Sequence, residues 1–424
     1  WSIAGGHDLD GDGLADILIG APGAAQGAGE LHLFSGKTRW ARDESATLRW
    51  RGEYAQDALG ETIRIAPDID GNGLADILVN APNHPHALFY GALYLLTAPG
   101  AGGGIDEVAR GSFAGKDPDD FLANSFAVAG DLDGNGILDI IVGTGGIEQT
   151  FRLEGIEVWR PSGCFCSATA SFPTPPMRVA AAGDFDGDGL SDLLMQRGAT
   201  LFLAPGVPGG WTSGTTLEEL AATEIGEVIG PLHDGVGDLN GDGYDDLVVT
   251  DTYGFHLLFG RPQPWPEQIV LPAGADVTVL TDTLPYLAGG VDFTGDGLVD
   301  VAAVFRQNDG RVAVHLIPGM RGAWPRRIPV TTFPRICEVE EPRSSLFSIS
   351  FVGDADGDGA SDLAVGFPMA GENYTGSAFL IFGNPRGDPS PVLEVFMISS
   401  NPKTMEATRF SLPAKGEVER GEKR

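Results

Sequence analysis

A nine-residue acidic motif occurs seven times along the chain and constrains the fold more than any other feature. The first copy, residues 8–16, reads DLDGDGLAD. The others begin at Asp68, Asp131, Asp184, Asp238, Asp292 and Asp354. Every copy has an oxygen-bearing side chain at positions 1, 3, 5 and 9 and glycine at positions 4 and 6. Alternating oxygen ligands on a sharply turning backbone are typical of a loop that binds a hard divalent cation.

The motif predicts one structural calcium site per copy, or about seven Ca²⁺ in all. Calcium takes six to eight oxygen ligands, and glycine permits the positive φ angles that a tight loop needs. We expect side-chain oxygens from positions 1, 3, 5 and 9, and the backbone carbonyl of position 7, to hold the ion. An ordinary Asp- and Gly-rich turn is the alternative, but it does not require Asp at position 9. The predicted ligands are Asp8, Asp10, Asp12, Leu14, Asp16, Asp68, Asp70, Asn72, Leu74, Asp76, Asp131, Asp133, Asn135, Ile137, Asp139, Asp184, Asp186, Asp188, Leu190, Asp192, Asp238, Asn240, Asp242, Tyr244, Asp246, Asp292, Thr294, Asp296, Leu298, Asp300, Asp354, Asp356, Asp358, Ala360 and Asp362.

The residues after each motif exclude a helix–loop–helix calcium site. That site needs Glu at position 12 and a helix on either side. Position 12 here is Ile19, Val79, Val142, Met195, Val249, Ala303 or Val365. Position 9 is followed by a short, mostly apolar run, which indicates a buried strand. Each motif is therefore predicted to join two strands.

The spacing of the motifs predicts a β-propeller. Successive copies are 60, 63, 53, 54, 54 and 62 residues apart, and the chain is rich in Gly (62) and Pro (29). A period of this length that contains only strands indicates blades of four strands each. We predict an all-β, seven-bladed propeller of antiparallel blades over residues 1–400, with each calcium loop between the first and second strand of its blade. Residues 401–424 are predicted to be a tail with a decayed strand and then disorder.

Individual strands can also be assigned from the repeat. In blade 1 we place the four strands at residues 1–7, 17–19, 29–36 and 46–51, and in blade 3 the third strand at 155–163.

The motif and its surroundings resemble the FG-GAP repeat of integrin α-subunit head domains and their bacterial relatives. GAP at 20–22, NAP at 80–82 and GFP at 366–368 follow the second strands, and Leu59-Gly60, Phe126 and Phe347 are remnants of the FG element. The resemblance covers nearly the whole chain, although the GAP element is missing from blades 3 to 6. Integrin heads carry such loops in only some blades, so seven loops indicate a bacterial or otherwise simple relative. The resemblance implies calcium loops on one face and a protein partner on the other.

Charge and composition limit the kinds of partner that the chain can bind and the cellular compartments in which we expect it. The net charge of −32 argues against nucleic acid, and no apolar stretch is long enough for a membrane span. The chain begins at Trp1 inside a repeat, so we expect a removed signal peptide or upstream region. Weak calcium loops fill only at extracellular calcium levels, so we predict a monomeric protein that is extracellular, on the cell surface or periplasmic. Cys164, Cys166 and Cys337 form no disulfide or zinc pattern.

Other conspicuous residues have simple structural interpretations. His32, His256 and His315 occupy equivalent third-strand positions, where Leu96, Trp159, Phe202 and Phe379 stand in other blades, and are predicted to pack. Trp211, Trp265 and Trp324 follow the third strand and either plug a blade edge or stack on sugars, the first being favoured. Two short matches carry little information about function: the integrin-binding tripeptide Arg386-Gly387-Asp388 and the two histidines of His84-Pro85-His86, which are more often loop polarity than a metal site. An acidic rim opposite the calcium loops is predicted from Asp57, Asp117, Asp119, Asp120, Phe121, Glu227, Glu338, Glu340 and Glu341.

Three functions are compatible with the sequence. The favoured one is a non-enzymatic, calcium-stabilised adhesion or binding module whose protein or glycan ligand binds opposite the calcium loops. A polysaccharide lyase-like enzyme would require converging His, Tyr, Arg or Lys at one mouth of the channel, and no catalytic residue can be assigned. A lectin that uses the Trp loops is the third. The sequence does not reveal the partner.

Overall fold

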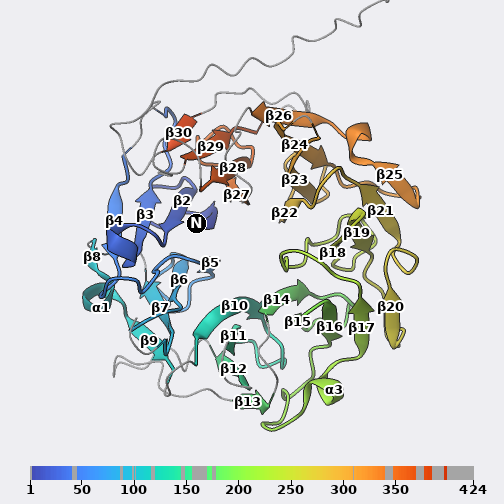
Figure 1. Cartoon of the computed structure of the whole chain (residues 1–424), viewed down its shortest axis with the longest axis horizontal. Coiled ribbons are helices and arrows are strands. Elements are labelled where there is room, and N and C mark those ends of the chain that lie inside the picture. The colour runs from blue at the N-terminus through green and yellow to red at the C-terminus, as the bar shows by residue number, and fades with distance from the viewer. Residues whose placement is uncertain are drawn as a thin grey trace, which may run out of the picture.

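A computed structural model describes residues 2–40, 45–85, 89–97, 100, 102–115, 120–144, 149–154, 170–173, 178–308, 310–339, 347–368, 377–383 and 396–398. The described strands form seven sheets, which we number in chain order and which are arranged in a ring (Figure 1). The all-β propeller architecture predicted from the repeat is confirmed. Within the described residues no helix is long and apolar enough to cross a membrane.

The first three sheets account for residues 2–173. Sheet 1 contains β1 (Ser2–His7), β2 (Asp16–Ala21), β3 (Glu30–Phe34), β4 (Leu48–Arg51) and β8 (Gly103–Gly104). Sheet 2 contains β5 (Ile63–Ala66), β6 (Asp76–Ala81), β7 (Ala92–Thr97) and β9 (Gly111–Ala114). Sheet 3 contains β10 (Leu122–Gly130), β11 (Asp139–Thr144), β12 (Gln149–Glu154) and β13 (Ala170–Pro173).

The remaining four sheets complete the ring. Sheet 4 contains β14 (Arg178–Gly183), β15 (Asp192–Arg197), β16 (Thr200–Ala204), β17 (Thr223–Gly226) and β20 (Gln268–Val270). Sheet 5 contains β18 (Leu247–Asp251), β19 (Gly254–Leu258), β21 (Val277–Leu280) and β25 (Arg327–Pro329). Sheet 6 contains β22 (Tyr286–Val291), β23 (Asp300–Arg306), β24 (Val312–Ile317) and β26 (Arg335–Val339). Sheet 7 contains β27 (Ser348–Gly353), β28 (Asp362–Phe367), β29 (Ser377–Ile381) and β30 (Phe396–Ile398). Four short helical turns complete the described structure: η1 (Ala25–Gly27), α1 (Ile105–Val108), α3 (Leu217–Leu220) and η2 (Val330–Thr332).

The named strands of sheets 2, 3, 6 and 7 pair only antiparallel, whereas sheets 1, 4 and 5 each add one parallel strand at the outer edge. β8 pairs parallel with β4, β20 with β17, and β25 with β21. Each of these added strands comes from the next repeat along the chain, between its third and fourth strands. An outer strand with unpaired backbone groups is prone to non-specific pairing. These additions therefore cover the outer edges of sheets 1, 4 and 5 and tie each of them to a neighbour.

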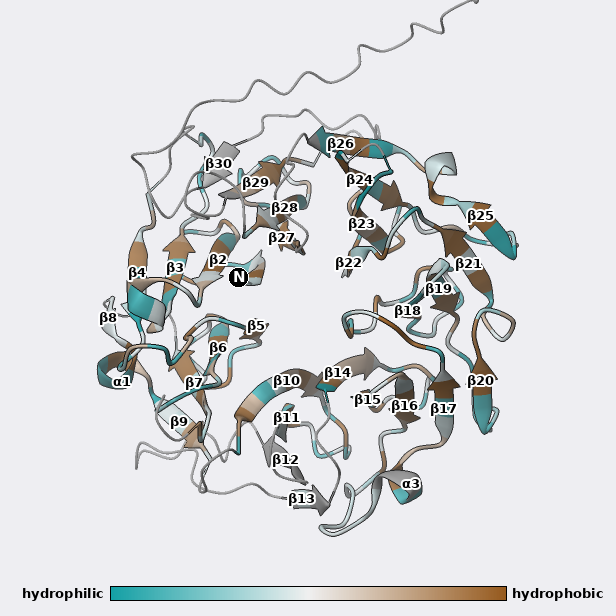
Figure 2. Cartoon of the chain, viewed as in Figure 1, coloured by the Kyte–Doolittle hydropathy of each residue, from teal (hydrophilic) through white to brown (hydrophobic). Residues whose placement is uncertain are grey.

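The hydrophobic core lies between neighbouring sheets. Leu31 and Trp50 of sheet 1 pack with Ile77 and Tyr94 of sheet 2 in one buried cluster. Figure 2 shows hydrophobic residues concentrated along strands such as β3, β7 and β21. Removing these faces from water stabilises the ring by roughly 25 cal/mol per Å² of apolar surface.

The ring closes between sheets 7 and 1 without a shared strand. Ile3, Phe34 and Trp40 pack with Val352 and Leu380 in a buried cluster. The backbone N–H of Ala15 donates to the carbonyl of Asp354 at 3.0 Å. The indole N–H of Trp40 donates to the carbonyl of Ala355 at 3.1 Å. Closure therefore depends on packing and on contacts made by the acidic loop of sheet 7.

Two strand predictions were wrong. The third strand of sheet 3 is β12, whereas residues 155–163 were predicted; residues 155–169 lie outside the described ones. We also predicted a first strand before the acidic loop of every blade, but in sheet 5 the segment 231–237 forms no strand and meets the second strand only in a single bridge between Gly237 and Asp246. Residues 401–424, and the assignments made there, also lie outside the described part of the chain.

The tryptophans that follow the third strands pack against neighbouring sheets. Trp265 is 8% exposed, and its ring meets the edge of Phe185 in sheet 4 at a centroid distance of 5.4 Å. Trp324 is partly buried and tilts against Phe259 at 6.0 Å. Trp211 is partly buried against the cluster that contains Met195. This arrangement favours the edge-packing interpretation over a row of sugar-stacking rings.

We expect Trp265→Ala to lower the free energy of unfolding by about 3–5 kcal/mol, because it empties a buried site between two sheets. The matched variant Trp324→Ala should cost about 1–2 kcal/mol, because that ring is already partly in water. Urea unfolding followed by circular dichroism measures both. Equal losses for the two variants would contradict the packing described here.

Candidate metal centre

All seven acidic loops have the same backbone conformation. Both glycines of every loop have positive φ, between 74° and 94°. For example, Gly11 and Gly13 have φ of 84° and 89°. A residue with a Cβ atom is strained in this region of φ/ψ space. The predicted reason for glycine at positions 4 and 6 is therefore confirmed.

Three hydrogen bonds recur in every loop. The N–H of position 6 donates to Oδ2 of position 1 at 2.7–3.0 Å. The N–H of position 7 donates to the side-chain oxygen of position 5 at 2.6–3.1 Å. The N–H of position 2 donates to Oδ2 of position 9 at 2.6–3.0 Å. These bonds fold each loop so that its carboxylates converge.

The aspartate at position 9 also has a structural role that the sequence did not predict. In sheets 1, 4, 5, 6 and 7 its Oδ1 accepts a hydrogen bond at 2.8–2.9 Å from the N–H of the glycine that follows the third strand. In sheet 1 this bond joins Asp16 to Gly36. All seven position-9 side chains are fully buried. Each of these five aspartates therefore ties its loop to the turn after the third strand.

Burial makes these carboxylates costly to ionise. It raises the pKa of Asp16 and Asp76 to about 6, of Asp192 and Asp246 to about 7, and of Asp362 to about 8, against opposing backbone hydrogen bonds in every case. Neighbouring loop carboxylates raise the pKa of each further. A nearby cation would reverse this effect, because it favours the ionised form.

Five loops bring three carboxylates together. In sheets 1, 2, 3, 4 and 7, one oxygen from each of positions 1, 3 and 9 lies within 4.8 Å of the other two. These sets are Asp8, Asp10 and Asp16; Asp68, Asp70 and Asp76; Asp131, Asp133 and Asp139; Asp184, Asp186 and Asp192; and Asp354, Asp356 and Asp362. Position 5 is not part of these close sets.

The loops of sheets 5 and 6 differ because position 3 is not acidic. Asn240 donates from its amide to Asp242 at 2.9 Å. The N–H of Thr294 donates to Oδ2 of Asp300 at 2.8 Å, and the buried Thr294 hydroxyl has no hydrogen-bond partner. At positions 1, 3 and 9 these two loops therefore present two carboxylates instead of three, with a neutral oxygen at position 3.

The donor set fits calcium. Carboxylate, amide, hydroxyl and carbonyl oxygens are the ligands that calcium prefers, whereas zinc and copper sites draw on His and Cys. Oδ1 of the fully buried Asp76 has no hydrogen-bond partner, although it belongs to a cluster of three carboxylates. A buried, unpaired carboxylate oxygen costs free energy unless a cation or donor satisfies it. The geometry therefore suits a divalent cation better than an ordinary turn.

Among the described residues, loops of neighbouring sheets contact one another at four junctions of the ring. At three of them, between sheets 7 and 1, 3 and 4, and 4 and 5, the N–H of position 8 donates to the position-1 carbonyl of the preceding loop, as in Ser191 to Asp131 at 2.9 Å. At these three and between sheets 5 and 6, the residue after the third-strand glycine donates to the position-2 carbonyl of that loop, as in Met320 to Leu239 at 2.9 Å. The shape of one loop therefore constrains the next sheet.

Two residues from sheet 5 reach the loop of sheet 4 and were not predicted. Oδ2 of Asp245 accepts from the N–H of Asp184 at 2.8 Å. The amide of Gln263 donates to Asp186 at 2.6 Å. Asp245 stands at position 8, where no other loop has an acidic residue, and this was the only signal in the sequence.

The three third-strand histidines are buried in different sheets. His32 lies 3.1 Å from Glu30, His256 lies 3.0 Å from Asp251, and His315 contacts the carbonyl of Phe333 at 3.2 Å. Their predicted packing role agrees with this geometry. In register, the counterpart of His32 in sheet 2 is Tyr94, whereas Leu96 was predicted.

The predicted acidic rim is only partly described, and two of its members are not on the surface. Asp57 is fully buried; it accepts from the N–H of Tyr54 at 2.9 Å and lies 2.9 Å from Nδ1 of His84. Asp120 is 2% exposed. The sequence gives no sign that these carboxylates are used inside the connecting turns. His86, Asp117, Asp119, Glu340, Glu341, Cys164, Cys166 and the Arg386-Gly387-Asp388 tripeptide lie outside the described residues.

Comparison with known proteins supports the resemblance to integrin α subunits. The FG-GAP repeat family matches residues 1–34. Integrin alpha-5 of Xenopus laevis is 31% identical over 160 residues, which are 35% of this chain and 15% of that protein. Integrin alpha-PS5 of Drosophila melanogaster is 34% identical over 90 residues, which are 20% of this chain and 9% of that protein. The chain thus spans only a small part of the length of these relatives.

One solved structure illustrates a more distant likeness. It is that of an Agrocybe aegerita lectin that recognises non-reducing terminal N-acetylglucosamine, with 14% identity and a TM-score of 0.41 over 94% of this chain and 90% of the lectin chain. At that TM-score the likeness carries no argument about function.

The two roles of the loop carboxylates can be separated within the loop of sheet 1. In calcium-free buffer, Asp16→Ala should lower the free energy of unfolding by about 2–4 kcal/mol, because two buried backbone donors lose their acceptor. Asp10→Ala should change it by less than about 0.5 kcal/mol, because Asp10 is exposed and accepts only from Asp12 at 3.2 Å. Chemical unfolding in EDTA measures both. A large loss for Asp10→Ala without metal would contradict these assignments.

Proposed function

We propose that the chain is a calcium-stabilised, extracellular, seven-bladed β-propeller that acts as a protein-binding or adhesion module. The observation that carries the proposal is the repetition of one loop geometry at the same end of every sheet. The resemblance to integrin α subunits supports the protein-binding role. The seven sheets support one blade per repeat.

In this proposal the oxygens of positions 1, 3, 5, 7 and 9 hold calcium in each loop. Bound calcium would supply positive charge that offsets the repulsion among the loop carboxylates. Position 9 would hold the loop to the end of the third strand, and positions 1 and 5 would keep the glycine turn closed. Because neighbouring loops bond to one another, the ions would stabilise the ring as well as each loop. Calcium is thus assigned a structural role.

The proposed partner surface lies opposite the loops. β18 begins directly after the acidic loop of sheet 5 and ends at the hairpin that carries Tyr253, so the two lie at opposite ends of the sheet. Tyr253 is 54% exposed, and Ile229 and Leu284, at 39% and 38%, are also exposed. The N–H of Ile229 donates to the carbonyl of Thr250 at 2.8 Å, one residue before β18 ends at this hairpin. We call Ile229, Tyr253 and Leu284 the sheet 5 patch.

A solvent-exposed apolar patch on a rigid scaffold is a common feature of protein-binding surfaces. Aromatic residues such as tyrosine contribute disproportionately to binding energy in such patches. The sheet 5 patch is therefore the part of this face that we assign to a protein partner. The buried Trp265 gives no comparable support to a lectin that uses the tryptophan loops.

Removal of calcium should lower the melting temperature sharply. Each site filled at about 100 times its Kd stabilises the folded state by about 2.7 kcal/mol, so several sites together form a large part of the stability. The experiment compares thermal unfolding in about 5 mM calcium, where weak extracellular sites are filled, with unfolding in excess EDTA. An unchanged melting curve would overturn the calcium proposal, and magnesium at the same concentration serves as the control.

Replacement of Tyr253 should weaken partner binding without affecting the fold. Tyr253→Asp places a charge in the sheet 5 patch and should reduce the affinity for a cell-surface or matrix protein at least tenfold, about 1.4 kcal/mol. Met320→Ser is the matched control, because Met320 is 39% exposed at the loop end of the ring. Surface plasmon resonance against an array of extracellular proteins gives the readout. Equal binding by both variants would place the partner elsewhere.

A further inference from the structure

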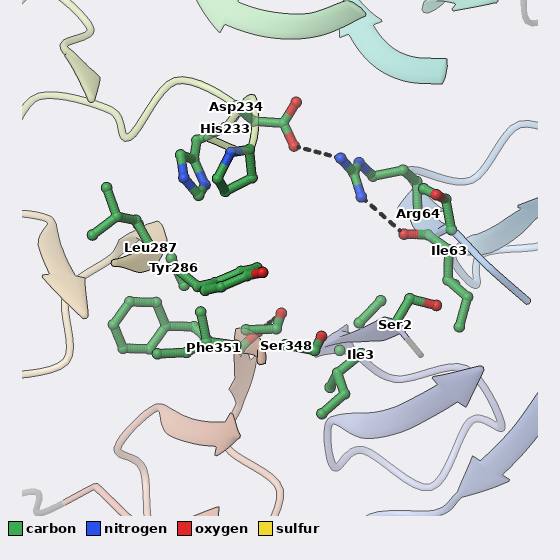
Figure 3. A pocket seen from close by; sticks show the side chains of 18 of the residues that line it. Ser2, Ile3, Ile63, Arg64, His233, Asp234, Tyr286, Leu287, Ser348 and Phe351 are labelled. Carbon is green, nitrogen blue, oxygen red and sulfur yellow. Dashed lines mark hydrogen bonds and ion pairs between the residues drawn. The ribbon is translucent and has the colours of Figure 1, made fainter. Parts of the chain in front are cut away.

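A cavity on the axis of the ring is a separate candidate binding site. It has a volume of about 440 Å³ and is lined by the first strands of sheets 1, 2, 6 and 7 and by residues 231–236 of sheet 5. Figure 3 shows its side chains. The volume lies in the range of small-molecule sites, which is about 300–1,000 Å³.

An ion pair spans the axis of the ring within this cavity. Arg64 of sheet 2 lies 3.3 Å from Asp234 of sheet 5, and the two side chains are 34% and 41% exposed. Asp234 also accepts from the N–H of Ala181 at 3.1 Å, and Arg64 donates to the carbonyl of Ile63 at 3.2 Å. These contacts leave part of each charged group facing the cavity. The pair therefore presents a strong donor and a strong acceptor side by side.

An aromatic ring and its hydroxyl face the same space. Figure 3 shows the Tyr286 hydroxyl pointing into the cavity, with Ser348 on the neighbouring strand β27. The Ser2 hydroxyl also belongs to the lining but donates to the carbonyl of Gly60 at 2.9 Å. The Tyr286 ring is half-buried and is held edge-on by Phe347 at a centroid distance of 5.7 Å. Its orientation is therefore fixed by packing before any ligand arrives.

The cavity as a whole is close to electrically neutral. Arg64 and Asp234 offset one another, and burial lowers the pKa of His233 to about 4, so its imidazole is uncharged at neutral pH. The remaining ionisable side chains of the lining are His7, at the loop end, and Tyr286, whose pKa burial raises above its ordinary value, so that its phenol is neutral at neutral pH. A charged ligand of either sign would have to compete with the existing ion pair. A neutral ligand that both donates and accepts can bond to both partners at once.

We propose that this cavity binds a neutral sugar of one or two rings. Adjacent sugar hydroxyls would donate to Asp234 and accept from Arg64 in charge-assisted hydrogen bonds. The C–H face of the sugar would pack on the apolar ring of Tyr286, while the tyrosine hydroxyl stays available for a hydrogen bond. This inference goes beyond the proposed protein-binding function, since it uses neither the calcium loops nor the sheet 5 patch.

The test titrates the calcium-loaded chain with glucose, galactose, mannose, N-acetylglucosamine and maltose, with glucuronate and glucosamine as charged comparators. Saturation-transfer NMR and calorimetry give the Kd. We expect saturable binding of at least one neutral sugar with a Kd of about 1 mM or lower, equivalent to about −4 kcal/mol. Asp234→Asn and Tyr286→Ala should each weaken it at least tenfold. Met320→Ser is the control and should bind as the unchanged chain does.

Three outcomes would overturn the proposal. These are no saturable binding of any neutral sugar, tighter binding of glucuronate or glucosamine than of every neutral sugar, and binding that both cavity variants leave unchanged. Thermal unfolding confirms that each variant is folded, and Arg64→Gln provides a second cavity variant if one of the others is not. Calcium binding and the Tyr253 measurements do not depend on this result, so its failure is distinguishable from failure of the proposed function.

Discussion

The structure depends on carboxylates that are buried at the end of every sheet. A buried carboxylate is unfavourable unless hydrogen bonds or a cation compensate it. Here the position-9 aspartates are fully buried and accept backbone hydrogen bonds from their own loop, and five also accept one from the turn after the third strand. The same loops bond to the next sheet, as Ala15 does to Asp354 where the ring closes. The hydrogen bonds that shape each loop and those that join neighbouring sheets thus involve the same acidic loops. These bonds compensate the buried carboxylates and explain how a chain with net charge −32 can place so many acidic residues at one end of its sheets.

The loop end and the opposite end of the ring consequently have different properties. At the loop end, fixed hydrogen bonds and packed tryptophans such as Trp265 leave little that can rearrange. The opposite end carries hairpins and connections whose exposed side chains, including Tyr253, do not support the ring. Exposed side chains on such connections can vary with little effect on the core, which is why binding functions are commonly placed there. The axial cavity lies between the two, walled by strands that the ring holds in place.

Much of the fold could be predicted from the sequence, because the loop motif fixes backbone conformation residue by residue. Gly11 and Gly13 imply positive φ, and the apolar residues after Asp16 imply a buried strand. The errors came where local pattern and tertiary pairing diverge. Residues 155–163 end in glycine like other third strands, yet β12 precedes them. Residues 231–237 have the right spacing for a first strand but form only one bridge.

The candidate sites were predictable only where their ligands are close in sequence. The convergence of Asp8, Asp10 and Asp16 follows from their spacing in one loop. The Arg64–Asp234 pair joins residues 170 positions apart, one on β5 and one in the segment 231–236, which meet only once the ring has closed. Asp57 looked like a surface acid but is buried beside His84, because the connecting turns use it as a hydrogen-bond acceptor.

The central claim is that each acidic loop holds a calcium ion. The most direct measurement is the number of ions bound per chain, determined by equilibrium dialysis against about 1 mM calcium followed by elemental analysis, since extracellular sites are filled near that concentration. The account predicts about seven ions per chain, one for each loop, all removed by EDTA. A chain that retains none, or no more than about one ion at this concentration, would contradict it.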